Sequence, residues 1–429
     1  MAREMKDSGI EWIGEIPREW SVYPAKFAFS EIRNKNTDGE ITKALKFYNG
    51  TIIPKSNFDA NSDDYVAETI TTYTVVKTDM IMINGLNLNY DLKSLRVGLV
   101  KEEGVITSAY LALMPDVNRI LPLYATYLFK GYETRMAFHN MGAGIRKTLG
   151  FKEFKNQPVL IPSLSEQQAI ADFLDTQCVH IDSVIEKTRA AIEEYKKLKQ
   201  SVITQAVTKG IRPNREMKDS GIEWVHEIPV DWQNINPKAM FSLRKEKASV
   251  GEKQLTSSQN YGIIYQDEYM ELSGSKVVTV QKDFDILKHV EKGDFVISMR
   301  SFQGGLEYSE FTGSISSAYV MLIPNKSIVY PKFFRWLFKS ALYINALQST
   351  SNMVRDGQAM RFSNFIQVRL YSVPLEEQKE IADYLDNKIP MIDSLITKKE
   401  KLINELETYK KSLIYEYVTG KKEVPVHAN

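Results

Sequence analysis

The sequence of 429 residues contains a single cysteine, Cys178, so the chain cannot form an internal disulfide bond. This is typical of a protein from a reducing compartment. No segment approaches the roughly 20 uninterrupted apolar residues of a membrane-spanning helix, and the opening residues lack the apolar run of a secretory signal. These absences predict a soluble cytoplasmic protein that has no membrane partner.

The motifs that would indicate catalysis within the chain are also missing. There is no Asp/Asn-Pro-Pro-Tyr/Phe motif of the kind that adenine methyltransferases carry, and no Gly-x-x-x-x-Gly-Lys-Ser/Thr phosphate loop. The five histidines are scattered, without the spacing of metal ligands. We therefore expect a non-catalytic protein that holds no metal or cofactor of its own. The net charge of +1 argues against non-specific DNA binding, although local basic patches remain open.

What the sequence does contain is a long internal repeat. Residues 5–20 read MKDSGIEWIGEIPREW, and residues 217–232 read MKDSGIEWVHEIPVDW. A second matched pair, SEQQAIADFLD and EEQKEIADYLD, starts at Ser165 and at Glu376. The period of roughly 210 residues is far too long for a solenoid and indicates two tandem domains. Because the segments between the matches diverge, we favour two similar tasks on two different targets, with simple duplication as the alternative.

The tryptophans of the repeat return at equivalent positions. A residue that distinguishes two different targets should differ between the copies, so these four are expected to be packing anchors. They are Trp12, Trp20, Trp224 and Trp232.

The divergent middles have the pattern of mixed strand and loop. β-Branched and apolar runs predict strands at 73–76, 79–83, 276–280 and 294–297, separated by Gly and Asn clusters. A short apolar helix is predicted after Pro122 and another after Pro331, each with proline in its first turn.

The constant segments that follow are predicted to be helical. Ser165 with Gln168 fits a capping box, and breaks are expected near Cys178 and at Pro390. Apolar residues then recur at gaps of three and four, as in a coiled coil, with Lys399 interrupting the second copy. The predicted contact residues are Ile181, Ile185, Thr188, Ile192, Tyr195, Leu198 and Val202 in the first copy, and Ile392, Leu395, Leu402, Leu406, Tyr409 and Leu413 in the second.

Each helix of about 27 residues would span about 40 Å, close to one turn of DNA at about 34–36 Å. An antiparallel pair could therefore hold two domains against two sites on one duplex. An ordinary helical hairpin or an oligomerisation stalk would give the same periodicity.

These segments resemble a known family. The pattern DSGIEW-x-x-x-IP-x-x-W and the Pro-x-x-Glu-Gln-x-x-Ile-Ala-x-x-Leu-Asp segment are similar to Type I restriction-modification specificity subunits, although the first copy has one extra residue before Glu-Gln. The resemblance implies double-stranded DNA, two methyltransferase subunits and restriction/translocase subunits as partners. It also implies that S-adenosylmethionine, ATP and Mg are held by those partners. Partner-binding residues would be Glu166, Gln167, Glu377 and Gln378.

With this resemblance, the expected fold is α+β, with two tandem mixed α/β target-recognition domains separated by long helices that pair as an antiparallel coiled coil. The domains would span 1–163 and 213–375, and the conserved helical regions 164–212 and 376–429. Each domain would read one half of a bipartite DNA site. The alternatives are a scaffold that assembles a DNA-modifying complex without reading sequence, and a free-standing methyltransferase or nuclease.

Base readout requires forked donors and acceptors, such as Arg for guanine and Asn or Gln for adenine, presented on loops. Two polar, Gly-containing loops in each domain fit this requirement, although a surface loop without a ligand would look the same. In the first domain the candidates are Asn84, Asn87, Asn89, Lys93, Arg96, Arg146 and Lys147. In the second they are Arg300, Ser301, Gln303, Arg355, Gln358 and Arg361. The basic residues after 140 and after 350 would position phosphate rather than specify bases.

Overall fold

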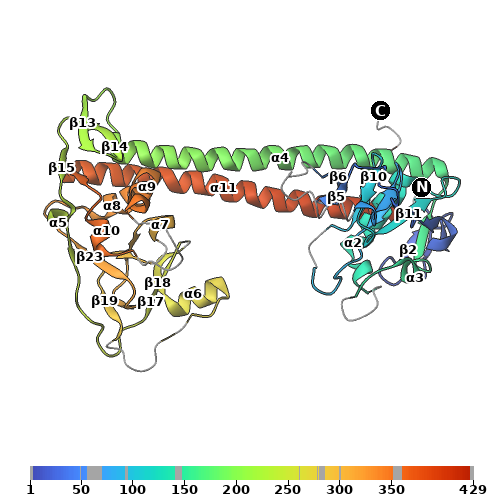
Figure 1. The fold of residues 1–429 in the computed structure, drawn as a ribbon, viewed down its shortest axis with the longest axis horizontal. Coiled ribbons are helices and arrows are strands. Elements are labelled where there is room, and N and C mark those ends of the chain that lie inside the picture. The colour runs from blue at the N-terminus through green and yellow to red at the C-terminus, as the bar shows by residue number, and fades with distance from the viewer. Residues whose placement is uncertain are drawn as a thin grey trace. The chain divides into compact units, whose positions relative to one another are not determined.

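The computed structural model describes residues 3–48, 50–55, 70–91, 95–140, 147–259, 261–277, 279, 286–298, 301–350 and 360–425. The chain forms two compact units (Figure 1). Unit 1 consists of Met1–Arg189 with Lys401–Asn429, and unit 2 of Ala190–Glu400. Each unit contains one of the divergent middles and one stretch of each long helix. The α+β class is confirmed, while the four segment boundaries drawn from the sequence stay predictions.

Unit 1 is built on a four-stranded antiparallel sheet in the order β4-β11-β8-β9. Its central strand β8 is buried at every residue, as its run of Ile and Met predicts. Smaller antiparallel pairs are β1-β2, β3-β12, β5-β6 and β7-β10. The strands are β1 (Met5–Asp7), β2 (Glu15–Pro17), β3 (Ser21–Pro24), β4 (Phe29–Glu31), β5 (Leu45–Tyr48), β6 (Thr51–Pro54), β7 (Thr74–Val76), β8 (Ile81–Ile83), β9 (Val97–Leu99), β10 (Gly104–Ile106), β11 (Leu111–Pro115) and β12 (Pro158–Ile161). The short helices are η1 (Ala25–Phe27), α2 (Pro122–Thr134), η2 (Ala137–Asn140) and α3 (Phe151–Phe154).

Unit 2 repeats this arrangement with the sheet β16-β23-β20-β21 and the pairs β13-β14, β15-β24, β17-β18 and β19-β22. The strands are β13 (Met217–Ile222), β14 (Val225–Pro229), β15 (Gln233–Ile235), β16 (Phe241–Leu243), β17 (Leu255–Ser258), β18 (Gly262–Tyr265), β19 (Lys288–Val290), β20 (Phe295–Ile297), β21 (Glu307–Tyr308), β22 (Gly313–Ile315), β23 (Val320–Pro324) and β24 (Leu370–Ser372). The short helices are α5 (Pro237–Met240), α6 (Gln266–Ser273), α7 (Ser301–Gly304), α8 (Pro331–Leu337), α9 (Ala341–Ser349) and α10 (Phe362–Phe365). The matching order confirms a duplicated domain.

Most of the local predictions are confirmed. Strands occur within 73–76, 79–83 and 294–297, and α2 and α8 begin at the prolines that were expected in their first turns. The strand expected at 276–280 is wrong at residues 276, 277 and 279, which have no regular structure. Residues 278 and 280 lie outside the described residues.

The two long helices are α4 (Leu164–Lys209) and α11 (Leu375–Val418). The predicted breaks are wrong: α4 runs through Cys178, and Pro390 lies inside α11. A proline interrupts one backbone hydrogen bond, but a helix with a long apolar face can retain its path. The predicted capping residue is also wrong, because the hydroxyl of Ser163, not Ser165, accepts the Glu166 N–H at 3.3 Å.

Within each unit the two helix stretches lie side by side and run antiparallel (Figure 1). In unit 1, Asp182 and Arg189 of α4 pair with Lys410 and Glu407 of α11, at 2.6 and 3.0 Å. In unit 2, Lys199 pairs with Asp393 at 2.7 Å. Because partners that advance along α4 recede along α11, the antiparallel prediction is confirmed.

The apolar row that each helix buries differs in part from the predicted one. In α4, Leu198 is exposed and the half-buried Lys199 takes its place. In α11, Leu395, Leu402 and Tyr409 are exposed, whereas the neighbouring residues Ile396, Ile403 and Lys410 turn inward. Since adjacent positions are both apolar at 395–396 and 402–403, the sequence pattern could not choose between them.

The core of unit 2 continues into its helices. Ile203 and Val207 from the end of α4, and Ile381 and Leu385 from the start of α11, pack in one cluster with Trp232. In unit 1 the end of α11 has this role. Its Val418 lies against Gly131 of α2, where a Cβ would come within 2.6 Å of the valine methyl. Among the described residues, no helix is both long and apolar enough to cross a membrane.

Candidate functional site

In unit 1, the buried side chain of Arg96 fixes the backbone of the polar loop that follows β8. Its guanidinium is buried, with 1% of the residue exposed, and it donates to the carbonyl oxygens of Asn84, Leu86 and Asp91 at 2.9, 2.8 and 2.6 Å. The backbone N–H of Arg96 donates to Glu133 of α2. The prediction that Arg96 reads bases is therefore corrected, since its guanidinium is buried and both of its terminal nitrogens donate to the loop backbone.

Glu133 lies in the same buried site beneath this loop. Burial raises the pKa of Glu133 to about 7, against the opposing effect of the Arg96 N–H and the charge of Lys130. Burial also lowers the pKa of Lys130. One carboxyl oxygen of Glu133 is buried without a hydrogen-bond partner. The base of the loop is thus a cluster of ionisable side chains whose neutral forms are favoured by burial.

The structure brings together two predicted DNA-binding segments of unit 1 that are about 60 residues apart in the sequence. Leu88 N–H donates to the Lys147 carbonyl at 3.1 Å, and Leu149 N–H donates to the Gly85 carbonyl at 2.9 Å. A Cβ at position 85 would lie 2.4 Å from the Leu149 carbonyl oxygen, so this close approach requires glycine. The loop 84–91 and the segment at 147 therefore form one surface.

The remaining candidates of unit 1 are placed as follows. Asn87 and Asn89 are exposed, with Asn87 at a positive φ of 53°, while Asn84 and Lys147 are half-buried. Lys93 and Arg146 lie outside the described residues. Sequence reasoning missed Tyr90, whose side chain is 72% exposed on the same loop. An aromatic residue between polar residues in an Asn-rich loop is the signal that could have identified it.

The equivalent loop of unit 2 also has an internal support. Ser301 is buried, and its hydroxyl accepts the Ser298 N–H at 2.8 Å. The prediction that Ser301 contacts DNA is therefore corrected, because this side chain closes the turn before α7. Gln303 lies in α7, and Arg361 is exposed at the start of α10. Arg300, Arg355 and Gln358 lie outside the described residues.

The start of each long helix is held by the same set of side chains. In unit 1, the indole N–H of Trp20 donates to Glu166 at 2.9 Å. Arg3 pairs with Glu166 at 2.7 Å and with Glu19, and it lies 5.5 Å from the Trp20 ring centroid. The side-chain amide of Gln167 accepts the Leu121 N–H at 2.8 Å. We call Arg3, Trp20, Glu166 and Gln167 the unit 1 clamp.

Unit 2 repeats the clamp residue by residue. Trp232 donates to Glu377 at 3.1 Å, and Arg215 pairs with both Glu377 and Asp231 while lying 5.5 Å from the Trp232 ring centroid. The side-chain oxygen of Gln378 accepts the Tyr330 N–H at 2.7 Å. Sequence reasoning missed the two arginines, although the repeat extends back to them as Arg-Glu-Met-Lys-Asp in both copies. The clamp shows that the constant residues maintain the scaffold.

Comparison with known protein families also finds two copies of one domain in the chain. Residues 33–194 and 229–408 each match the family described as the Type I restriction modification DNA specificity domain. The chain belongs to this family. It is a Type I DNA specificity subunit with two target-recognition domains, one in each matched segment.

The chain is similar to two specificity subunits of Methanocaldococcus jannaschii. One is described as the putative type I restriction enzyme MjaX specificity subunit, and it is 26% identical over 91% of this chain and 90% of its own length. The other, the type I restriction enzyme MjaVIII specificity subunit, is 23% identical over 90% and 89%.

Solved structures share the fold at 13% identity. A chain from a study of complex assembly and conformational transition of the type I R-M system has a TM-score of 0.65, covering 95% of this chain and 99% of that one. The HsdS subunit from Thermoanaerobacter tengcongensis has a TM-score of 0.53, covering 97% and 100%. These likenesses concern the fold.

In this specificity subunit, the residues expected to bind partner subunits have a different role. The side chains of Gln167, Glu377 and Gln378 are buried, with 0–2% of each residue exposed, and all three are hydrogen bonded within their own unit. Glu166 is occupied by Trp20 and Arg3. The burial of Gln167, Glu377 and Gln378 contradicts direct partner contact by these three residues, whereas for Glu166, whose side chain is 25% exposed, partner contact stays a prediction.

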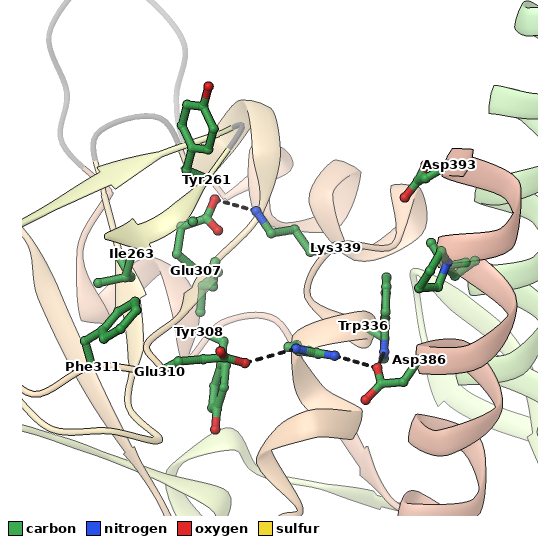
Figure 2. A pocket seen from close by; sticks show the side chains of 15 residues that line it. Tyr261, Ile263, Glu307, Tyr308, Glu310, Phe311, Trp336, Lys339, Asp386 and Asp393 are labelled. Atoms are coloured by element: carbon green, nitrogen blue, oxygen red, sulfur yellow. Dashed lines mark hydrogen bonds and ion pairs between the residues drawn. The ribbon is translucent and has the colours of Figure 1, made fainter. Parts of the chain in front are cut away.

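A cavity of about 480 Å³ in unit 2 lies between the recognition domain and α11 (Figure 2). On the helix side, Asp386 accepts from the Trp336 indole at 2.7 Å and from Arg335 at 2.5 Å. On the sheet side, Glu307 pairs with Lys339, and burial raises the pKa of Glu307. These carboxylates already have cationic or N–H partners, so the network fixes α8 against α11 and offers no unpaired catalytic acid.

The described part of the chain has no cluster of three or more His, Cys, Asp or Glu side chains arranged to hold a metal ion. The buried carboxylates of the described residues have structural partners: Glu377 belongs to the unit 2 clamp, Glu307 pairs with Lys339, and Asp294 pairs with Arg244 at 2.6 Å.

Proposed function

We propose that each recognition domain reads one half of a bipartite DNA site through the surface formed in unit 1 by the loop 84–91 and the segment at 147, and in unit 2 by the equivalent loops. The observation that carries this proposal is the contrast within the repeat. Clamp residues are the same in both copies, whereas the loops that the scaffold presents differ. A rigid scaffold with divergent polar loops suits two different base sequences.

Single substitutions at exposed loop residues test this proposal. Asn87→Ala in unit 1 and Arg361→Ala in unit 2 should each weaken binding to one half-site by about tenfold, because a good side-chain contact to a base contributes about 1–3 kcal/mol. Competition binding with duplexes altered in either half measures the effect. A loss that is equal for every duplex, including random sequence, would mark phosphate contacts and support the scaffold alternative.

We further propose that the long helices dock two methyltransferase subunits, and that the assembled complex recruits restriction/translocase subunits. The helices expose apolar side chains at equivalent positions, Leu198 of α4 at 47% and Tyr409 of α11 at 53%. Large apolar side chains exposed on otherwise charged helices favour protein contacts.

Leu198→Lys and Tyr409→Lys should each reduce the number of bound methyltransferase subunits from two to one, and the double variant should bind none. Light scattering of the mixed subunits measures the stoichiometry. Glu194→Ala, an exposed residue one turn before Leu198 on the same face of α4, serves as a control and should leave two copies bound. If both single variants retain two copies, the docking surface lies elsewhere.

We also propose that the chain itself is not catalytic and that S-adenosylmethionine, ATP and Mg bind the partner subunits. The arrangement of the buried acids supports this, since each one serves a structural contact. The purified chain incubated with DNA and S-adenosylmethionine, or with DNA and a divalent metal, should give no methylated or cleaved product. Product formation by the chain alone would contradict the proposal.

A further inference from the structure

The two long helices present equivalent rows of side chains to each other, since each position of α11 corresponds to the position 211 residues earlier in α4. Two ion pairs follow this equivalence. Asp182 of α4 pairs with Lys410 of α11 at 2.6 Å, and Lys199 of α4 pairs with Asp393 of α11 at 2.7 Å. Each helix therefore carries one acid and one base of this set. An antiparallel pair of two α4 helices would bring Asp182 to Lys199 and would satisfy the set equally well.

A second set of charged residues lies between these positions in the sequence of each helix. Its cations and anions are distributed differently over the two helices. Arg189 of α4 pairs with Glu407 of α11 at 3.0 Å in unit 1. The equivalent position pair in unit 2 is Lys196 of α4 and Glu400 of α11. Lys196 makes its ion pair within α4, with Glu193 at 2.9 Å, and this pair raises the pKa of Lys196, to which the charge of Glu400 adds. Both cations of this set belong to α4, and both anions belong to α11.

This second set distinguishes one helix partner from another. In an antiparallel pair of two α4 helices from two chains, the same register would place Arg189 beside Lys196. In a pair of two α11 helices it would place Glu400 beside Glu407. Like charges at facing positions are unfavourable, and flanking charges of this kind determine partner choice in coiled coils. The apolar rows, by contrast, are similar in the two helices.

We propose that Arg189, Lys196, Glu400 and Glu407 form a pairing code that directs α4 to α11 and rejects α4 from a second copy of this chain. The first set of charges and the apolar row stabilise any antiparallel pair of these helices equally. The second set makes α4 prefer α11 to the α4 helix of a second copy. The code does not depend on DNA binding. It matters because two α4 helices that paired with each other would bring together two identical recognition domains instead of two different ones.

The test uses the full chain refolded from denaturant at low salt, with Cys178→Ala removing the native thiol and Ala191→Cys introduced as a reporter. Position 191 lies midway between the facing residues of α4, so in an antiparallel α4–α4 pair it meets its own counterpart. A disulfide-linked dimer therefore reports that pairing. R189E/E400R gives each helix one cation and one anion and places like charges at the facing positions of α4 and α11. The comparison variant R189E/E407R has the same composition and also mixes the charges on each helix, but it keeps opposite charges at the facing positions of α4 and α11.

We expect R189E/E400R to give at least about fivefold more covalent dimer than the unswapped chain, because attraction and repulsion at the facing positions are both inverted. The comparison variant should give a dimer fraction between those of R189E/E400R and the unswapped chain, because it loses the repulsion between two α4 helices but keeps the attraction of α4 for α11. The differences should shrink in 1 M salt. Equal dimer fractions in the three proteins would overturn the proposal. If R189E/E400R does not refold, the variant R189E/K196E/E400K/E407K tests the proposal instead. It places both anions on α4 and both cations on α11, so it should form no more dimer than the unswapped chain. More dimer than the unswapped chain would overturn the proposal.

Discussion

The conformation of the unit 1 surface depends on the ionisable side chains of Arg96 and Glu133, which lie beneath the loop 84–91. Arg96 holds three backbone carbonyl oxygens of the loop, and Glu133 accepts the Arg96 N–H from α2. A loop fixed at so many points loses little conformational entropy on binding, which favours specific contacts. The sequence placed Arg96 in the correct loop but assigned it to DNA. The pattern of residue types does not reveal that the residue immediately before β9 turns its side chain inward.

Arg96→Ala should reduce the free energy of unfolding by about 3 kcal/mol, because three buried carbonyl oxygens lose their donor. Urea unfolding measures the change. Arg33→Ala is the matched control, since the Arg33 side chain is 79% exposed and pairs only at the surface. A loss for Arg96→Ala no larger than that of the control would show that water replaces the guanidinium without cost.

The raised pKa of Glu133, about 7, predicts a pH-dependent stability. Between about pH 4.5 and 7 the unfolded chain has lost this proton while the folded protein retains it, so the stability falls as the pH rises. The contribution of this residue should decrease by an amount on the order of 3 kcal/mol and level off above pH 7. Glu133→Gln should remove that slope. Parallel pH profiles for the two proteins in urea unfolding would contradict this assignment.

At the scale of the elements, α11 retains its helical path through a proline. Pro390 is exposed and lies within Leu375–Val418, although its missing N–H and its ring ordinarily interrupt a helix. The apolar contacts that Ile381, Leu385, Ile389 and Ile392 make on the inner face stabilise the helix more than the proline destabilises it. Propensity alone predicted a break here, since the stabilising contacts come from residues distant in the sequence.

Pro390→Ala should therefore raise the free energy of unfolding by about 1–3 kcal/mol, because alanine supplies the missing N–H and has a higher helix propensity. Thermal or urea unfolding measures the gain. Lys388→Ala, an exposed change in the same turn, should have almost no effect. A variant less stable than the parent would show that α11 requires the proline.

The row of residues that the two helices bury against each other could also not be predicted fully from the local sequence. The periodicity predicted a coiled coil and an antiparallel pair, and both are present. It selected Leu395, Leu402 and Tyr409, which are exposed, instead of Ile396, Ile403 and Lys410. A repeat of three and four residues fits two adjacent rows when both contain apolar residues, and only the partner helix determines which row is buried.

At the scale of the whole molecule, the repeat was the strongest signal in the sequence, and the duplicated order of strands confirms it. The same repeat located the Glu-Gln pairs of the clamps but did not reveal their structural role. A Glu-Gln pair that anchors the start of a helix to its domain and one that binds a partner look alike in a sequence. The loops were located correctly because Gly and Asn mark turns, whereas their contacts depend on distant segments. Gly85 and Leu149 illustrate this, being joined only in the folded unit.

The central claim is that each unit reads its own half of the DNA site. Replacing residues 233–374 with residues 21–163 of the same chain would present the unit 1 loops twice, on clamps that are equivalent in both units. Mapping methylated adenines in cells that also supply the partner subunits would report the site. We predict that the parent chain directs methylation to two dissimilar half-sequences, and that the exchanged chain directs it to two copies of the half read by unit 1. An unchanged site, or one in which both halves are new, would contradict the account.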